Sequence, residues 1–304
     1  MRFPSTLIEF QDRFPDEESC WQYLRRVRWP HGFRCPRCQG RESSFIRTRR
    51  LEQCRGCRSQ ASVTAGRVFH KTRVGLRVWL LGIFFVARHK KGISALQFQR
   101  DTGLGSYQTA WTLLHKLRSS LGRRTGELLS GLVEADEAYV GGPRRGIQGR
   151  GAPNKSIVAL AVEQRPHSAG SLRLAVVPDV SWDSLGAFLR GAIEGANTTV
   201  LTDGWSGYEP LAAAGVDHKP TVQGPPARGS EILPWVHVAI SNLKTWLRGT
   251  FHGVSHKHLP RYLAEFAYRF NRRWREGELF QFVAQRAMRG EPLPYHRLTA
   301  EVVG

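Results

Sequence analysis

Long apolar runs are missing from this chain of 304 residues. The longest, Val78 to Ala87, would cover about half of a membrane span, and Arg77 and Arg88 flank it. The first residues, Met1-Arg-Phe-Pro-Ser, also lack the apolar core of a secretory signal. We therefore expect a protein that neither crosses a membrane nor enters a secretory route.

Cysteines and acidic residues are also scarce. There are five cysteines, of which four form a spaced pattern and Cys20 is left over, so the sequence favours a reducing interior over a disulfide-stapled secreted protein. The 25 acidic residues face 45 lysines and arginines, which gives a formal net charge of +20. This balance favours a polyanionic partner. Nucleic acid is a stronger candidate than an anionic membrane surface, because the chain has little apolar sequence that could attach to a membrane.

Hydrophobic residues account for 41% of the chain, which is enough for a folded protein with two or three domains. The four patterned cysteines form two pairs, Cys35-Pro-Arg-Cys38 and Cys54-Arg-Gly-Cys57, with fifteen residues between them. Cysteines that flank a tight turn can both point at one ion, and two such turns make a tetrahedral thiolate cage. The pattern predicts a structural zinc ribbon that grips a partner; four buried or reactive thiols are the alternative. A helix over residues 5–24 should precede it.

A helix-turn-helix pattern follows the predicted ribbon. A short helix after Gly92, a glycine-bearing turn at Thr102 to Gly105 and a longer helix with a polar start occur in that order. The second helix of such a motif enters the major groove, and the residues that would face the base edges are Tyr107, Gln108 and Thr109. An ordinary helical hairpin is the alternative interpretation.

Short segments rich in Val, Leu and Ala come next and predict strands. We expect strands over 132–140, 156–163, 171–178 and 198–203, a short fifth over 218–223, and helices over 182–193, 235–248 and 257–274. This order predicts a mixed sheet with helices on both faces.

Two glycine-rich loops interrupt this part of the chain. Residues 141–155 carry five glycines together with Arg144 and Arg145, and residues 224–230 are rich in Pro and Gly. The loops are either solvated surface or flexible basic arms that follow DNA phosphates.

Two acidic residues lie where carboxylates pack poorly. Asp136 is inside the first expected strand, on the same face as Glu134, and Asp203 ends the fourth. Burying an unpaired carboxylate is costly, and a divalent cation shared between neighbouring strands would relieve that cost. Oxygen ligands suit Mg²⁺ or Mn²⁺. The alternative is that each acid is a solvated strand end or a helix cap.

A site for two metal ions needs a further oxygen ligand, and the candidates are Asn242, Glu231 and Glu265. Asn242 lies at the edge of the apolar stripe of its helix, where it can face a cleft beside the sheet. Lys244 and Arg248 share that helix and could steady a phosphate.

Four histidines lie nearby, but histidines in a basic stretch more often contact phosphate or solvent than metal. We therefore expect none of them to be a first-choice ligand; they are His237, His252, His256 and His258.

Four motifs carry a family resemblance. They are Asp136-Glu-Ala-Tyr-Val-Gly-Gly, Leu201-Thr-Asp-Gly-Trp, the stretch from His237-Val-Ala-Ile-Ser-Asn-Leu-Lys, and Tyr268-Arg-Phe-Asn-Arg-Arg. Together they resemble the insertion-sequence transposases of the DDE superfamily, in particular the zinc-ribbon group of the ISXO type. The likeness runs over nearly the whole chain.

This resemblance implies a ribonuclease-H-like catalytic domain whose metal-binding triad is Asp136, Asp203 and Asn242, with Asn where most of the superfamily has Glu. It implies a transposase that binds the terminal repeats of its element and then cleaves and joins DNA strands with Mg²⁺ or Mn²⁺. Its partners would be double-stranded DNA, at element ends and target, and at least one further copy of the chain. The expected location is the prokaryotic cytoplasm, at the nucleoid.

The predicted fold class is therefore α+β and multidomain. Its parts are a helix with a zinc ribbon (1–70), a helical helix-turn-helix-like region (71–127), a ribonuclease-H-like mixed-sheet α/β catalytic domain (128–280) and a C-terminal tail (281–304). Two other functions remain open: a DNA-binding regulator without catalysis, and a ribonuclease-H-like nuclease that cuts without joining. Only the first of these leaves the pairing of Asp136 with Asp203 unexplained.

Overall fold

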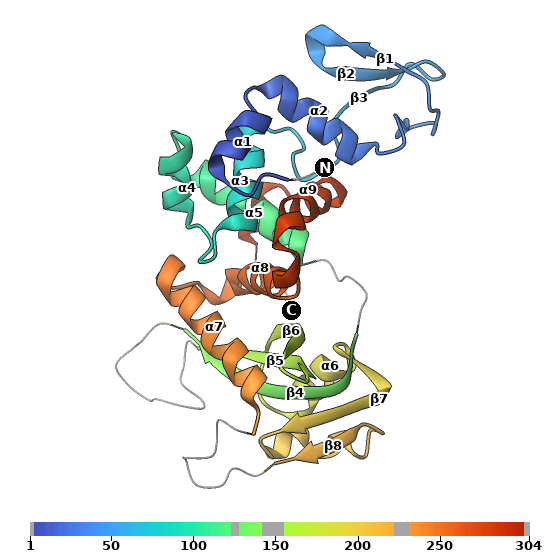
Figure 1. Cartoon of the computed structure of the whole chain (residues 1–304). Helices are drawn as coiled ribbons and strands as arrows, with labels where there is room; N and C mark the ends of the chain where they lie inside the picture. Colours follow the sequence, from blue (N-terminus) through green and yellow to red (C-terminus); the bar gives the residue numbers. More distant parts are fainter. Residues whose placement is uncertain (1–2, 123–127, 142–154, 222–231, 301–304) are drawn as a thin grey trace. The chain divides into compact units, whose positions relative to one another are not determined.

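A computed structural model describes residues 3–122, 128–141, 155–221 and 232–300 (Figure 1). The described residues form two compact units. Unit 1 contains those of Met1–Leu121 together with Arg275–Ala300, and unit 2 contains those of Gly122–Trp274. No helix among these residues has both the length and the apolar character that a membrane crossing requires.

Unit 1 begins with two helices, where the sequence predicted one over residues 5–24. The helix α1 ends at Arg13, and Pro15 and Asp16 follow before α2 begins. Asp16 accepts a hydrogen bond from the Ser19 N–H at 2.8 Å and so caps a new helix start. A three-stranded antiparallel ribbon comes next. These elements are α1 (Leu7–Arg13), α2 (Glu17–Arg28), β1 (Ser43–Ile46), η1 (Arg47–Arg49), β2 (Leu51–Cys54) and β3 (Gln60–Ser62).

The rest of unit 1 is helical and includes residues from the far end of the chain. The region expected as a C-terminal tail contains α9, which packs on α2, α3 and α5. At its start, the Phe280 ring contacts those of Phe10, Phe14 and Tyr23. The helices are α3 (Leu76–Arg88), α4 (Ala95–Thr102), α5 (Tyr107–Leu121), η5 (Arg273–Glu278), which crosses the boundary between the units, α9 (Leu279–Arg289) and α10 (Tyr295–Thr299).

Unit 2 is built on a five-stranded sheet in the order β6-β5-β4-β7-β8. The first three strands along the chain pair antiparallel, whereas β7 is parallel to both β4 and β8. The predicted mixed sheet is confirmed, and its fifth strand ends at Pro220 rather than at residue 223. The strands are β4 (Leu129–Val140), β5 (Ser156–Arg165), β6 (Ser168–Val177), β7 (Ile193–Thr202) and β8 (Asp217–Pro220).

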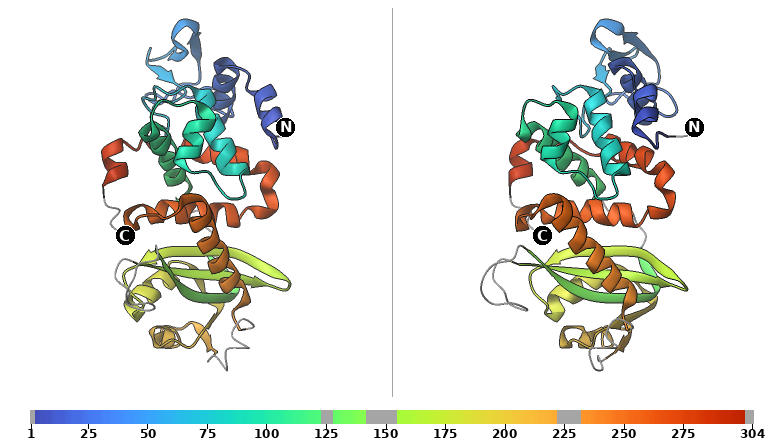
Figure 2. Two further views of the ribbon diagram at one scale, coloured as in Figure 1. Left: turned by 90° about the vertical axis from the view of Figure 1, so that its left-hand side faces the viewer. Right: turned by 60° about the vertical axis from the view of Figure 1, so that its left-hand side comes forward.

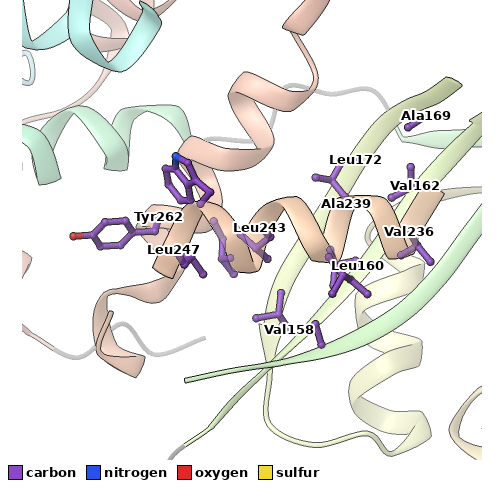
Figure 3. Close-up of a cluster of buried hydrophobic side chains, with 14 of the residues drawn as sticks. Val158, Leu160, Val162, Ala169, Leu172, Val236, Ala239, Leu243, Leu247 and Tyr262 are labelled. Atoms are coloured by element: carbon purple, nitrogen blue, oxygen red, sulfur yellow. The ribbon is translucent and has the colours of Figure 1, made fainter. Parts of the chain in front are cut away.

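Helices cover both faces of this sheet, as the element order predicted. On one face Val158, Leu160 and Val162 of β5 pack against α7 (Figure 3); Figure 2 shows this helix crossing the sheet. On the other face Ala159 and Ala161 belong to the core beneath α6. A strand that is buried on both faces reads as a continuous apolar run, which is how β5 reads in the sequence. The helices are α6 (Trp182–Arg190), η2 (Ser206–Leu211), α7 (Pro234–Phe251), η4 (His256–His258) and α8 (Leu259–Phe270).

The motif that begins at Tyr268 closes the open edge of this sheet. The Asn271 side chain accepts a hydrogen bond from Leu172 N–H at 2.7 Å and donates one to the Leu172 carbonyl at 2.9 Å. It thereby pairs the backbone N–H and carbonyl of Leu172, which no neighbouring strand among the described residues reaches at this edge of the sheet. Arg273 donates to the carbonyls of Ala169 and Gly170 farther along the same edge. These two residues of the motif therefore have a structural role.

Folding of unit 2 should depend on pH through His218. Its Nε2 shares a hydrogen bond of 2.9 Å with the Thr202 hydroxyl, which is fully buried. Burial lowers the pKa of His218, against the opposing charge of Asp217. Between the lowered pKa of the folded chain and about pH 6.5, the unfolded chain therefore carries a proton on this imidazole that the folded chain does not. The free energy of unfolding consequently rises with pH over this range.

We expect this pH-dependent rise to be smaller in a His218→Gln variant, because no imidazole is then left to titrate. The measurement is the urea midpoint of unit 2 between pH 5 and 8. An equal slope in the variant and the parent protein would contradict the assignment.

Candidate metal centres

Four thiols form a cage at the base of the ribbon. The sulfur atoms of Cys35, Cys38, Cys54 and Cys57 all lie within 4.8 Å of one another. Each pair sits on a turn that ends in a left-handed residue, Gln39 (φ 64°) after the first pair and Arg58 (φ 58°) after the second. Among the residues that the structure describes, this is the one group of three or more His, Cys, Asp or Glu side chains arranged to hold a metal ion.

The thiols of the cage compete for negative charge. Hydrogen bonds, the first from the Cys38 backbone, lower the pKa of Cys35 to about 6. The Gly40 backbone lowers that of Cys38, but the other three thiols raise it to about 12. One thiolate therefore forms readily, whereas four adjacent thiolates need a cation among them. A Zn²⁺ ion bound by four thiolates meets that need.

The two aspartates singled out in the sequence lie on neighbouring strands. The parallel ladder between β4 and β7 pairs Glu134 with Leu201. The same register, continued by two residues beyond the last pair of the ladder, would bring Asp136 opposite Asp203, which directly follows β7. One oxygen of Asp203 accepts a hydrogen bond from the Trp205 N–H at 3.0 Å across Gly204, whose φ is 80°. The turn after β7 thus fixes the direction of this carboxylate.

Asp136 meets a histidine from α7. Its side chain is 16% exposed, and its Oδ2 lies 3.4 Å from His237 Nε2. Its Oδ1 accepts a hydrogen bond from the Glu137 N–H at 2.8 Å. The pKa of His237 is raised, first by the hydrogen bond with Asp136, and burial opposes this; the negative charges of Asp136, Glu134 and Asp203 raise it further. The negative charges of all three acids therefore favour the protonated form of His237.

A cavity of about 480 Å³ opens beside Asp136. Acidic side chains of β4 line one part of the cavity, and side chains from one face of α7 line the rest. The last cationic side chains on that face are Lys244 and Arg248. Glu137, which accepts a hydrogen bond from the buried Tyr208 hydroxyl at 3.3 Å, is part of the lining. The lining residues are Asp136, Glu137, His237, Ile240, Ser241, Lys244, Thr245 and Arg248.

His237 is a residue of α7 that contacts Asp136, whereas the sequence analysis proposed Asn242 of the same helix as the third ligand. Asn242 is exposed and is not among the residues that line the cavity. Five residues correspond to about 140° of rotation around a helix, so the two side chains leave α7 in different directions. The sequence held a signal for this: His237, Ser241, Lys244 and Arg248 recur at spacings of four, three and four residues, which makes a polar stripe.

The other predicted site residues have varied positions. Lys244 and Arg248 line the cavity with Asp136. Glu265, an alternative ligand, is fully buried in α8 and lies 3.6 Å from Arg269. Glu231, Arg144 and Arg145 fall outside the described residues.

The helix-turn-helix pattern corresponds to α4 and α5. Gly103, with a φ of 67°, caps α4 in the left-handed conformation, and the two helices pack on each other. Tyr107 is 52% exposed and Gln108 is also exposed, whereas Thr109 is half-buried. Tyr107 and Gln108 are therefore accessible to solvent at the start of α5.

Comparisons with known proteins agree with this arrangement. Residues 128–271 match a family model described as an ISXO2-like transposase domain. Residues 15–60 match one described as a transposase zinc-ribbon domain. A protein of Halobacterium salinarum, described as an uncharacterized protein in transposable element ISH50, is 26% identical over 215 residues, which cover 65% of this chain and 71% of that protein. The resemblance drawn from the four sequence motifs is thereby confirmed.

Proposed function

Because the chain carries the zinc-ribbon and ISXO2-like domains of an insertion-sequence transposase, we propose that it binds the terminal repeats of its element and catalyses metal-dependent cleavage and strand transfer of DNA. The observation that carries this proposal is the parallel pairing of β4 with β7, whose register, continued by two residues, would align Asp136 with Asp203. Asp136 also lines a cavity together with the cationic side chains of Lys244 and Arg248.

The donor groups at this end of the sheet fit a divalent cation. Asp136 and Asp203 offer carboxylate oxygens, and His237 offers an imidazole nitrogen on the same side as Asp136. Carboxylates suit Mg²⁺ and Mn²⁺, and the added imidazole makes Mn²⁺ at least as suitable as Mg²⁺. We propose these three residues as the metal-binding set, with Asp136 shared if two ions bind; their ligand atoms are not gathered as closely as the four sulfur atoms, so a cation would have to draw them together. When bound, such ions activate a water or a DNA 3′-hydroxyl and stabilise the leaving oxygen.

The remaining residues of the cavity would hold the DNA strand. Lys244 and Arg248 lie on the same face of α7 as His237. An α-helix rises about 1.5 Å per residue, so their positions are about 10 and 16 Å farther along the helix axis. Their cations can pair with phosphates next to the one that is cut, which orients that phosphate toward Asp136. Both cleavage and joining are displacements at phosphorus, so one such site can serve both steps.

Binding of the element ends is assigned to unit 1. The ribbon exposes arginines on both knuckles and at its tip, and α5 exposes Tyr107 and Gln108. Transposition brings two ends together, so we propose that at least two copies of the chain act on DNA. A regulator without catalysis would bind the same ends and leave them uncut. A nuclease would cut them and form no joined product.

The choice between His237 and Asn242 can be tested directly. We expect His237→Ala to weaken the apparent Mn²⁺ affinity in a cleavage assay by about 10- to 100-fold, because a metal-site group is lost. Asn242→Ala should stay within about twofold of the parent protein, because Asn242 is exposed outside the cavity. The measurement is the cleavage rate of a labelled element end as a function of Mn²⁺ concentration. The opposite ranking of the two variants would restore Asn242 as the third ligand.

A further inference from the structure

Glu134 is a fully buried carboxylate that the proposed mechanism does not use. It lies on β4 two residues before Asp136, and its exposed fraction is 0%. Its Oε2 accepts hydrogen bonds from the N–H groups of Trp235 and Val236, both at 2.8 Å. Its Oε1 is buried and has no hydrogen-bond partner among the described residues. Burying a carboxylate in this way is costly, so a compensating role is expected.

The bonds of Glu134 satisfy the start of α7. That helix begins with Pro234, which has no N–H, and the residue before it, Leu233, makes no side-chain cap. The first free N–H groups of a helix need acceptors, and a negative charge at that end is favourable. A Ser or Asp at position 233 could supply an acceptor locally, at lower cost. Glu134 differs from such a cap because it comes from the sheet and ties the helix to β4.

The residue that follows these two N–H groups is His237. Its Nε2 lies 3.4 Å from Oδ2 of Asp136, the next residue on the same face of β4. Two alternate residues of one strand therefore hold three consecutive residues of α7. Glu134 holds the backbone of Trp235 and Val236, and Asp136 contacts the side chain of His237. Rotation of α7 about its axis is restricted at the point where the metal-binding set is assembled.

We infer that Glu134 is a positioning residue, which anchors the first turn of α7 so that His237 stays beside Asp136 and the polar stripe of α7 faces the cavity. This inference rests on the proposed function, because it assigns a role within that site. In this role Glu134 would need to touch neither the DNA nor a metal ion. It acts through the backbone of α7.

Unit 1 contains a matched control for this device. The Glu17 carboxylate accepts hydrogen bonds from the N–H groups of Leu76 and Arg77, at 2.8 and 2.9 Å, at the start of α3. This helix also lacks a side-chain cap from its own N-terminal residue, Gly75. Glu17 thus also accepts two backbone hydrogen bonds at a helix start, one on each carboxylate oxygen where Glu134 uses Oε2 for both, and it has no part in the proposed metal site.

The experiment compares Glu134→Ala, Glu134→Gln and Glu17→Ala in the full-length protein. Hydrogen exchange at residues 235–237 reports the anchor, and Mn²⁺ affinity, measured by electron paramagnetic resonance with a duplex of the element end, reports the site. We expect Glu134→Ala to raise exchange at Trp235 and Val236 at least about tenfold and to weaken Mn²⁺ affinity by about 10- to 100-fold. For Glu134→Gln we expect exchange rates and Mn²⁺ affinity between those of the parent protein and of Glu134→Ala, because a neutral acceptor makes weaker hydrogen bonds. Glu17→Ala should lower thermal stability and leave Mn²⁺ affinity unchanged.

Three results would overturn the inference. One is a folded Glu134→Ala protein with Mn²⁺ affinity within twofold of the parent. Another is an equal loss of affinity in Glu17→Ala, which would indicate a general effect of stability. The third applies if Glu134→Ala does not fold: a Glu134→Gln protein whose hydrogen exchange and Mn²⁺ affinity both equal those of the parent would contradict the positioning role of Glu134. A parent protein that binds no Mn²⁺ would overturn the metal site itself, whereas a parent that binds Mn²⁺ and does not cut DNA would overturn only the proposed reaction.

Discussion

Asp136→Asn should reduce metal-dependent cleavage of the element ends by at least about 1,000-fold, which corresponds to about 4 kcal/mol of transition-state stabilisation. The substitution removes the negative charge that would hold the cation and leaves the side chain nearly isosteric. The amide oxygen can still accept the hydrogen bond from the Glu137 N–H, so the strand should keep its structure. The measurement is the rate of strand cleavage on a labelled terminal repeat with Mg²⁺ or Mn²⁺.

Asp183→Asn is the matched control for this variant. Asp183 is an exposed acid in the first turn of α6 and does not line the cavity. Its loss should leave cleavage within about twofold while changing the net charge by the same amount. If Asp136→Asn cleaves as fast as Asp183→Asn, the carboxylate of Asp136 does not serve the reaction.

Loss of the zinc cage should have the second large effect, on DNA binding. We expect the double variant Cys35→Ser, Cys38→Ser to lose its zinc and to bind the element ends at least about 100-fold more weakly. Binding of a structural zinc ion is worth about 10–16 kcal/mol in small zinc domains, so a three-stranded ribbon without it should not stay folded. The measurements are zinc content per chain and the Kd for a terminal-repeat duplex at fixed salt.

Cys20→Ala provides the comparison for the cage. The Cys20 thiol is fully buried in α2, and burial raises its pKa to about 12. It is therefore an inert core thiol, and the variant should keep one zinc ion per chain. A double variant that also keeps one zinc ion per chain would show that the metal is bound elsewhere. A zinc-free double variant with unchanged DNA affinity would remove the ribbon from the binding surface.

Features with a local cause could be predicted from the sequence. Two cysteines on one turn can meet one ion whatever surrounds them, and the spacing of Cys35 to Cys57 therefore identified the ribbon. The strands of the sheet were found from their content of Val, Leu and Ala, although β7 begins at Ile193, five residues before the predicted start. The break between α1 and α2 was missed, although Pro15 and the capping residue Asp16 mark it.

Long-range packing was less accessible. Nothing in the spacing of residues 279–289 indicates that α9 packs on α2, α3 and α5, because its apolar stripe would suit any complementary helix. The role of Asn271 at the edge of β6 was likewise invisible. Its amide group matches a backbone that lies 99 residues earlier in the chain.

The sequence by itself determined the four-cysteine cage and the mixed class of the sheet, because these follow from spacing along one turn and from the order of strands and helices. It also singled out Asp136 and Asp203, but the pairing of β4 with β7, which brings their strands together, came from the tertiary structure. Only the tertiary structure decided which residue of α7 meets Asp136. A helix presents a different side chain to its neighbour with every 100° of rotation. That rotation is set by the apolar contacts of α7 with β5 and by the hydrogen bonds of Glu134 to its first turn, and both involve residues far apart in the chain.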